Sequence, residues 1–416
     1  MSTESTLRGR VVTATADITD GVVAYDGGVL TYVGPASEFP GLLEPGLLEP
    51  SEGVTAGGAG RIIIPGLVDL HCHGALGTDF SEGSPEGARS ASRYLHSRGA
   101  TTLVASLVTG TPEDLVRNVK NLRTLTDEGL IAGSHLEGPF LSEAQCGAHD
   151  PALLLAPDAG LMAGLLDAAG PSLASVTLAA ELPGASALVE LLTAHGVIPS
   201  LGHTAADSPT AADFLAKAAA GLASAGHESA GQGNGRRRPT VTHLFNAMPS
   251  LHHRAPGPVS ASLAAARAGE AVVELIADGV HLAPQTVKLV FDLVGAGNIA
   301  LVTDSMAATG LQDGHYRLGS LAVTVDRGVA RVDSSGSIAG GTATLLDVVR
   351  CAVAAGVDLQ DAVASATAVP ASVLGLSALA GDLRAGMPAD VVVLNRELDL
   401  EAVLRRGEIL PRPEAA

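Results

Sequence analysis

The middle of the chain alternates short apolar runs with stretches rich in Ala and Leu, and this repetition constrains the fold more than any other feature. Apolar runs of this length are typical of buried strands, and strands that alternate with helices form parallel sheets. Eight such runs occur in order: IIIPGLVDLHCH, TTLVASLV, IAGSHLEG, SVTLAAE, GVIPSLGH, PTVTHLF, AVVELIADGVH and NIALVTDS. Eight parallel strands over roughly 250 residues predict an α/β fold, the (β/α)8 TIM barrel, with its active site at the C-terminal ends of the strands.

The two ends of the chain have a different texture. Residues 8–34 are short β-branched runs separated by Asp-Gly and Gly-Gly turns, which is typical of antiparallel hairpins. Residues 381–410 repeat this texture. We therefore predict a small β-sandwich domain made from both ends, residues 1–65 and 376–416, around a barrel of residues 66–375.

Composition excludes several classes of function. The net charge of -19 argues against nucleic-acid binding, because such proteins need a basic face to replace the counterions of phosphates. No long uninterrupted apolar stretch and no hydrophobic signal region at the N-terminus occur, so we expect a cytoplasmic protein that does not enter membranes. The run RRR at 236–238 follows a low-complexity stretch and is expected to be a solvated loop.

The predicted strand ends carry side chains that bind metals. Two histidines, at 71 and 73, share one face of the first strand because side chains two residues apart point the same way. A single histidine at a strand end is usually only a hydrogen-bonded polar residue, but six such ligands at five strand ends favour a metal centre. Nitrogen and oxygen donors without thiolates suit a catalytic zinc-like ion. The six candidates are His71, His73, Glu137, His203, His243 and Asp304.

Several phrases of the sequence resemble a known family. They are PGLVDLHCHG, HLEGPF followed by GAH, LGHT, THLFNAMPSLHHR, ELIADGVH and LVTDSMAATG. Together and in this order they are similar to the N-acetylglucosamine-6-phosphate deacetylases of the amidohydrolase superfamily, and the match runs over nearly the whole chain. The resemblance implies hydrolysis of the acetamide of N-acetyl-D-glucosamine 6-phosphate, an amino-sugar phosphate, to acetate and glucosamine 6-phosphate.

The resemblance also implies roles for the strand-end residues. The family's retained metal matches Glu137, His203 and His243, and its catalytic carboxylate matches Asp304. Such a carboxylate would take a proton from the attacking water and pass it to the departing amine. The first-strand histidines make a second ion plausible, with Glu137 as the bridging ligand. The cofactor is then one or two divalent ions per subunit, with zinc favoured and iron, cobalt or manganese compatible.

The substrate side follows from the same resemblance. His149 matches a histidine near the acetyl carbonyl and is expected to steady the oxyanion. Arg254 and His281 match positions that contact the 6-phosphate, and the arginine can come from a neighbouring subunit, so we expect a homodimer. The remaining substrate-binding candidates are Ala148, Asn246, Ala247, Ile338, Ala339 and Gly340.

Three alternatives remain open on the sequence alone. Another deacetylase of the same superfamily would share the metal ligands and differ in its substrate. A cyclic amidase or a purine deaminase would use the same barrel without a site for phosphate. A non-catalytic scaffold would not need the complete set of ligands that the chain carries.

Overall fold

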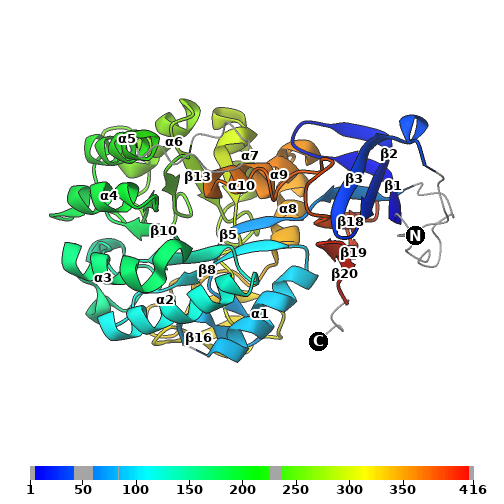
Figure 1. Ribbon diagram of the computed structural model, residues 1–416. Helices are drawn as coiled ribbons and strands as arrows, with labels where there is room; N and C mark the ends of the chain where they lie inside the picture. Colours follow the sequence, from blue (N-terminus) through cyan, green and yellow to red (C-terminus); the bar gives the residue numbers. More distant parts are fainter. Residues whose placement is uncertain (1–4, 42–59, 83, 225–236, 412–416) are drawn as a thin grey trace.

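A computed structural model describes residues 5–41, 60–82, 84–224 and 237–411. An eight-stranded parallel sheet lies at its centre, with the strands in the order β5-β8-β9-β10-β11-β12-β13-β14 (Figure 1). Each strand comes from one of the eight runs expected from the sequence, so the predicted barrel fold is confirmed. The strands are β5 (Val68–Cys72), β8 (Thr102–Leu107), β9 (Gly133–Glu137), β10 (Leu173–Leu178), β11 (Ile198–Leu201), β12 (Thr240–Val241), β13 (Val272–Leu275) and β14 (Ile299–Leu301).

The two edges of this sheet are held together by contacts between β5 and the residues after β14. The backbone N–H of Asp304 donates to the carbonyl oxygen of His71 at 2.9 Å. The Thr303 hydroxyl donates to a carboxylate oxygen of Asp69 at 2.6 Å. These bonds nearly close the barrel and bring the ends of its first and last strands side by side.

Helices cover the outside of the barrel (Figure 1). Side-chain caps start several of them: Ser84, Thr111 and Thr344 each accept a hydrogen bond from a backbone N–H in the first helical turn. Their apolar faces pack against the strands in one large cluster built mainly from Leu, Val and Ala. The helices are α1 (Pro85–Ser97), α2 (Pro112–Asp127), α3 (Ala159–Ala169), α4 (Ala185–Ala194), α5 (Ser208–Ser224), α6 (Gly257–Arg267), α7 (Pro284–Val294), α8 (Leu345–Ala354), α9 (Leu359–Ala366) and α10 (Ala368–Leu374).

The chain's two ends form a second sheet of seven strands beside the barrel (Figure 1). Its order is β3-β2-β1-β4-β18-β19-β20, so strands from both ends of the chain pair directly where β4 meets β18. The expectation that the two ends combine is therefore confirmed. The strands are β1 (Ser5–Val12), β2 (Asp17–Asp26), β3 (Val29–Pro35), β4 (Ile62–Pro65), β18 (Val391–Leu394), β19 (Leu400–Arg405) and β20 (Glu408–Ile409).

The run IIIPGLVDLHCH forms two strands instead of the single strand expected. Its first part is β4, in the seven-stranded sheet, and its second part is β5, in the barrel. The chain crosses between the sheets at Gly66, where an added Cβ would lie 2.0 Å from the hydroxyl oxygen of Thr101. Only glycine allows this close approach. Because the run is apolar throughout, the sequence does not show where the chain passes from one sheet to the other.

A three-stranded antiparallel sheet between β14 and α8 was not expected from the sequence. It consists of β15 (Gly314–Leu318), β16 (Leu321–Asp326) and β17 (Val329–Val332), and it packs on its own apolar cluster. A small hairpin, β6 (Gly74–Ala75) and β7 (Thr78–Asp79), follows β5. Both additions lie at the ends of barrel strands and so belong to the side where the site is expected.

The expectation of a solvated arginine loop is wrong for two of its three members. Arg237 donates to the carbonyl oxygens of Gly196 and Leu374, and Arg238 donates to Asn298 and Gly297. These bonds tie the start of β12 to neighbouring segments of the barrel. Arg236 lies outside the described residues.

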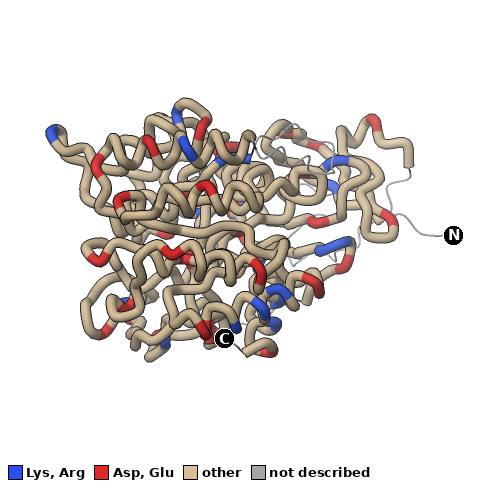
Figure 2. Tube along the Cα trace, turned by 60° about the vertical axis from the view of Figure 1, so that its left-hand side comes forward, with Lys and Arg blue, Asp and Glu red and all other residues tan. Residues whose placement is uncertain are grey.

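Charged residues are spread along the chain, with Asp and Glu positions interspersed among those of Lys and Arg (Figure 2). Among the described residues, none of the helices combines the length and the apolar character needed to cross a membrane.

Candidate active site

A pocket of about 280 Å³ opens at the C-terminal ends of the barrel strands. Side chains from strand ends form its floor, and the segment after β17 contributes to its wall. Most of the residues singled out from the sequence line it. They are His73, Glu137, Ala148, His149, His203, His243, Asn246, Ala247, His281, Asp304, Ile338 and Gly340.

One group of possible metal ligands is formed by Glu137, at the end of β9, with His203 and His243, which follow β11 and β12. One carboxylate oxygen of Glu137, Oε1, lies 3.0 Å from Nε2 of His203 and 2.8 Å from Nε2 of His243. The two Nε2 atoms are 3.1 Å apart. All three side chains are buried and their donor atoms converge on one point.

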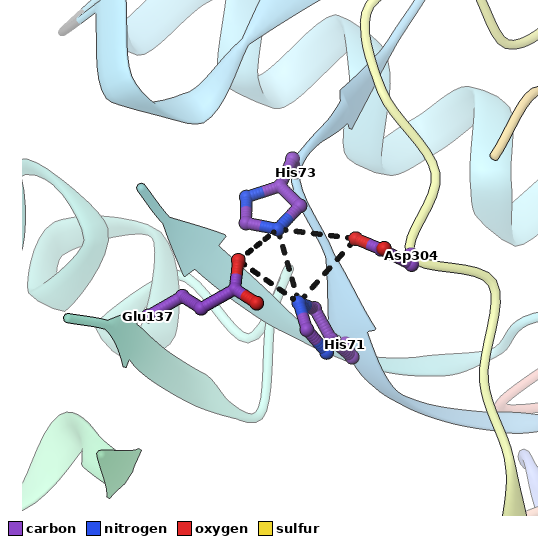
Figure 3. Close-up of side chains that lie close together, drawn as sticks. All are labelled: His71, His73, Glu137 and Asp304. Atoms are coloured by element: carbon purple, nitrogen blue, oxygen red, sulfur yellow. Dashed lines mark hydrogen bonds and ion pairs between the residues drawn. The ribbon is translucent and has the colours of Figure 1, made fainter. Parts of the chain in front are cut away.

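A second group lies on the other side of Glu137 (Figure 3). Its other oxygen, Oε2, is 3.0 Å from Nε2 of His73, which is itself 3.2 Å from Asp304 Oδ1. Nε2 of His71 lies 3.0 Å from that of His73 and 3.4 Å from Asp304 Oδ1. The two oxygens of one carboxylate thus face two different histidine pairs, which is the arrangement of a bridging ligand.

The spacing of these atoms fits divalent ions. Ligand nitrogens at about 2.0–2.1 Å from a tetrahedral zinc lie roughly 3.3 Å from one another. Within each group the donor atoms named above are 2.8–3.4 Å apart. Nitrogen and carboxylate donors suit zinc and other first-row ions. The residues therefore fit one ion held by Glu137, His203 and His243, and a second held with the first-strand histidines.

Outer hydrogen bonds orient the rings. Nδ1 of His203 lies 2.9 Å from the carbonyl oxygen of Gln145, and Nδ1 of His71 lies 3.3 Å from Glu274 Oε2. Such acceptors hold the ring proton on Nδ1 and leave the Nε2 lone pair free for a metal. Glu274 also accepts the backbone N–H of His243 at 3.3 Å. This buried carboxylate, on β13, therefore supports both ligand groups, and the sequence analysis missed it.

The backbone is strained where the ligands leave their strands. His203, His243 and Asp304 have φ of +47°, +30° and +47°, in the left-handed region that favours glycine. Such conformations cost roughly 1–3 kcal/mol each and gather at functional sites. The turn after each strand directs the side chain toward the barrel axis, so the strain is coupled to the position of the ligand.

The charges of the cluster are mutually stabilising. Burial alone would raise the pKa of the Asp304 carboxyl, but His71 and His73 hold that pKa below its ordinary range. Burial lowers the pKa of the His73 imidazole, whereas Asp304 and Glu137 raise it to about 9. A proton and a metal ion therefore compete for the nitrogen of His73, and Asp304 stays ionised and able to accept a proton.

The substrate side of the pocket is held by a second set of contacts. Nε2 of His149 lies 3.3 Å from Glu137 Oε2. Nδ1 of His281 lies 2.8 Å from Asp278 Oδ2, and both side chains are buried. Burial lowers the pKa of His281, but the hydrogen bond to Asp278 and the negative charges of Asp278 and Asp304 together outweigh it and raise that pKa. A cationic imidazole here would donate to an anionic ligand.

Three residues singled out from the sequence do not line the pocket. His71 is fully buried beneath it, and Ala339 packs into the apolar cluster under the three-stranded sheet. Arg254 is exposed, with a guanidinium nitrogen 2.8 Å from Nε2 of His253. Within the described part of the chain, the lining holds neither Lys nor Arg.

The structure also adds residues that the sequence analysis missed. Gly147, Leu318 and Ser337 line the pocket, and His135 stacks edge-on against His71 with ring centroids 4.7 Å apart. The alternation of β9 offered a signal for His135, because it shares a face with Glu137. No comparable signal marked Leu318 or Ser337, since both belong to the unexpected insertion and the segment that follows it.

Comparison with known proteins places the chain in a family. Residues 62–410 match the Amidohydrolase family. The N-acetylglucosamine-6-phosphate deacetylase of Homo sapiens is 34% identical over 86% of this chain and 85% of its own length, and that of Bacillus subtilis (strain 168) is 30% identical over 96% and 95%. A structure of the Mycobacterium smegmatis deacetylase, a mutant in complex with N-acetyl-D-glucosamine-6-phosphate, has a TM-score of 0.87 at 37% identity and covers 98% of this chain and 99% of that one. The chain belongs to the amidohydrolase family.

Proposed function

We propose that this chain is a metal-dependent N-acetylglucosamine-6-phosphate deacetylase that produces acetate and glucosamine 6-phosphate. The observation that carries the proposal is the cluster in which Glu137 faces two histidine pairs and Asp304 reaches the same pocket. The Mycobacterium smegmatis relative is described with N-acetyl-D-glucosamine-6-phosphate bound. An amino-sugar phosphate is therefore the substrate class that we assign to the pocket, and the cytoplasm is where we place the reaction.

We assign Glu137, His203 and His243 to one divalent ion, and His71 and His73, with Glu137, to a second. Zinc suits these nitrogen and oxygen donors, and iron, cobalt and manganese are compatible with them. When bound, such an ion polarises a carbonyl and makes a hydroxide-like nucleophile available near neutral pH. One or two ions per chain satisfy the donor set.

Asp304 is assigned the proton transfers. Its carboxylate lies 3.2 Å from the His73 ring and remains ionised despite burial, so it can accept the proton of the attacking water. The new C–O bond forms as this proton is taken, and the same carboxyl then gives the proton to the amide nitrogen as the C–N bond breaks. An amine leaves readily only when it is protonated, so one carboxylate serves first as base and then as acid.

The rest of the pocket orients the sugar. We assign His149 to the acetyl oxygen, and His281 with the backbone around Asn246 and Ala247 to the sugar phosphate. Ala148, Ile338 and Gly340 shape the wall, and Ala339 supports that wall from below.

Besides the His281 imidazole, the phosphate calls for a permanently charged cation, and the described lining holds neither Lys nor Arg. Arg254 is the candidate, because its planar fork matches phosphate oxygens and its exposed side chain is free to reach another molecule. We propose a homodimer in which Arg254 completes the site of the neighbouring subunit.

The test is acetate release from N-acetylglucosamine 6-phosphate and from its unphosphorylated form. We expect kcat/KM to favour the phosphorylated compound by roughly 10- to 100-fold, the effect of a charge-assisted contact. Arg254→Ala should remove most of this preference, and an unchanged preference would refute the phosphate assignment. Ammonia or ring-opened products from a purine or a cyclic amide would favour the other amidohydrolase activities, and a chain without bound metal or activity would favour a scaffold.

A further inference from the structure

Thr109, in the loop between β8 and α2, contacts Nδ1 of the His149 ring. Thr109 is buried, with 5% of its surface exposed. Its backbone N–H donates to Nδ1 of His149 at 3.3 Å, and its hydroxyl oxygen lies 2.9 Å from the same nitrogen. The backbone N–H and the hydroxyl of Thr109 thus both contact Nδ1 of His149.

These contacts decide which ring nitrogen carries the proton. A backbone N–H can only donate, so Nδ1 of His149 must accept. In the neutral ring the proton then lies on Nε2, which faces the pocket and Glu137 Oε2 at 3.3 Å. The Thr109 hydroxyl can donate to the same lone pair and reinforces this tautomer. His149 therefore enters the pocket as a hydrogen-bond donor.

The position of Thr109 is closely defined. Its hydroxyl oxygen lies 3.4 Å from the carbonyl oxygen of Glu137. An added Cβ at Gly138, which has φ of +94°, would lie 2.5 Å from that hydroxyl oxygen. The absence of a side chain at Gly138 thus makes room for Thr109 beside the backbone of Glu137.

We infer that Thr109 is a positioning residue that holds His149 as the Nε2–H tautomer, aimed at the acetyl oxygen of the substrate. The inference rests on the proposed deacetylation. The developing negative charge on that oxygen is stabilised by the Nε2–H donor, which is most effective when its direction is set before the reaction. His149 then keeps its proton throughout, and Asp304 alone receives and returns the proton of water.

The first test compares Thr109→Val with Thr109→Ser in the metal-loaded enzyme. Valine keeps the shape and the backbone N–H but removes the hydroxyl, so kcat should fall about fivefold, the usual effect of one lost hydrogen bond, with KM nearly unchanged. Serine keeps the hydroxyl and should restore kcat. Metal content, measured by elemental analysis, should be equal in all three proteins. If serine fails to restore kcat, or metal is lost with kcat, the inference is wrong.

The second test separates positioning from general damage. An N-trifluoroacetyl substrate stabilises the oxyanion through its fluorines, so the defect of Thr109→Val should shrink relative to the N-acetyl substrate. In a His149→Ala background, Thr109→Val should cause no further loss, because residues that act through one another are not additive. Equal defects for both acyl groups, or additive losses, would overturn the inference.

Two controls keep the outcome decisive. If Thr109→Val does not fold by circular dichroism, Thr109→Ala makes the same deletion with a smaller side chain. A wild-type protein that releases no acetate from either substrate would refute the proposed function itself. An active wild type with a fully active valine variant would refute only the role of Thr109.

Discussion

Asp304 is the residue on which the proposed chemistry depends most. We predict that Asp304→Asn lowers kcat by roughly 10²- to 10⁴-fold, the usual contribution of a general acid and base. Glu137, His203 and His243 remain intact, so the variant should still bind metal. Parallel measurements of kcat and of metal content check both statements. A variant that keeps more than a tenth of wild-type kcat would show that another group transfers the proton.

The supporting role of Glu274 is visible only in the structure, and it can be tested by substitution. Glu274 accepts hydrogen bonds from the His71 ring and from the backbone N–H of His243. Glu274→Gln should therefore misorient both histidines. Loss of such an outer partner typically weakens metal binding by roughly 10- to 100-fold. Competition with a chelator measures this affinity. Glu270→Gln, an exposed carboxylate just before the same strand, is the matched control and should bind metal like wild type.

The sequence predicted the candidate metal ligands but not the residues that orient them. Residue spacing put His71 and His73 on one face, and strand ends marked Glu137, His203 and Asp304. Thr109 and Glu274 carry no such mark, because a buried Thr or Glu is recognisable as a support only when its partner from another strand is in place. Arg254 was singled out, yet its exposed position depends on a loop whose course sequence periodicity does not predict.

At the scale of elements, the contact between β5 and the end of β14 deserves a test through Asp69. This carboxyl is buried, and burial raises its pKa from 3.8 to about 6 although Thr303 and the His71 backbone oppose the change. The fold therefore favours the protonated form. The stabilisation is complete below the unfolded pKa of 3.8 and is lost as pH rises through about 6.

Asp69→Asn should remove this dependence. The amide can take over the hydrogen bonds, because the Thr303 hydroxyl can turn its proton to the carbonyl oxygen of His71, 3.2 Å away. Between pH 4 and 7 the metal-free wild type should lose up to roughly 3 kcal/mol relative to the variant, measured by denaturant unfolding. Asp167→Asn, at an exposed carboxyl on α3, should behave like wild type. Parallel pH profiles for Asp69→Asn and wild type would contradict the account.

The strands and helices of the barrel could be predicted because their pattern repeats along the sequence. Eight apolar runs alternating with helices left little choice but a parallel barrel, and turn residues at both ends predicted the outer sheet. The division of residues 62–72 between two sheets was hidden because both parts are equally apolar. The three-stranded sheet at 314–332 was missed because its strands lie between a barrel strand and its helix, where the pattern expects a simple connection.

At the scale of the whole molecule, the proposed dimer can be tested by complementation. Arg254→Ala and Asp304→Asn chains, each of low activity alone, are co-expressed. If Arg254 acts across the interface, a mixed dimer has one intact site, and random assortment restores about a quarter of wild-type activity. If Arg254 serves its own chain, no site in the mixture is complete. Activity no higher than the mean of the two parents would refute the shared site.

The proposed deacetylation requires a divalent metal at the His, Glu and Asp cluster of the barrel mouth. The most direct measurement is acetate release from N-acetylglucosamine 6-phosphate by chelator-treated protein titrated with zinc. We predict no turnover without metal and a rise that saturates at one or two equivalents per chain, which the double variant His71→Gln, His73→Asn shifts toward one. Full turnover by the metal-free protein, or none with zinc, iron, cobalt or manganese, would contradict the account.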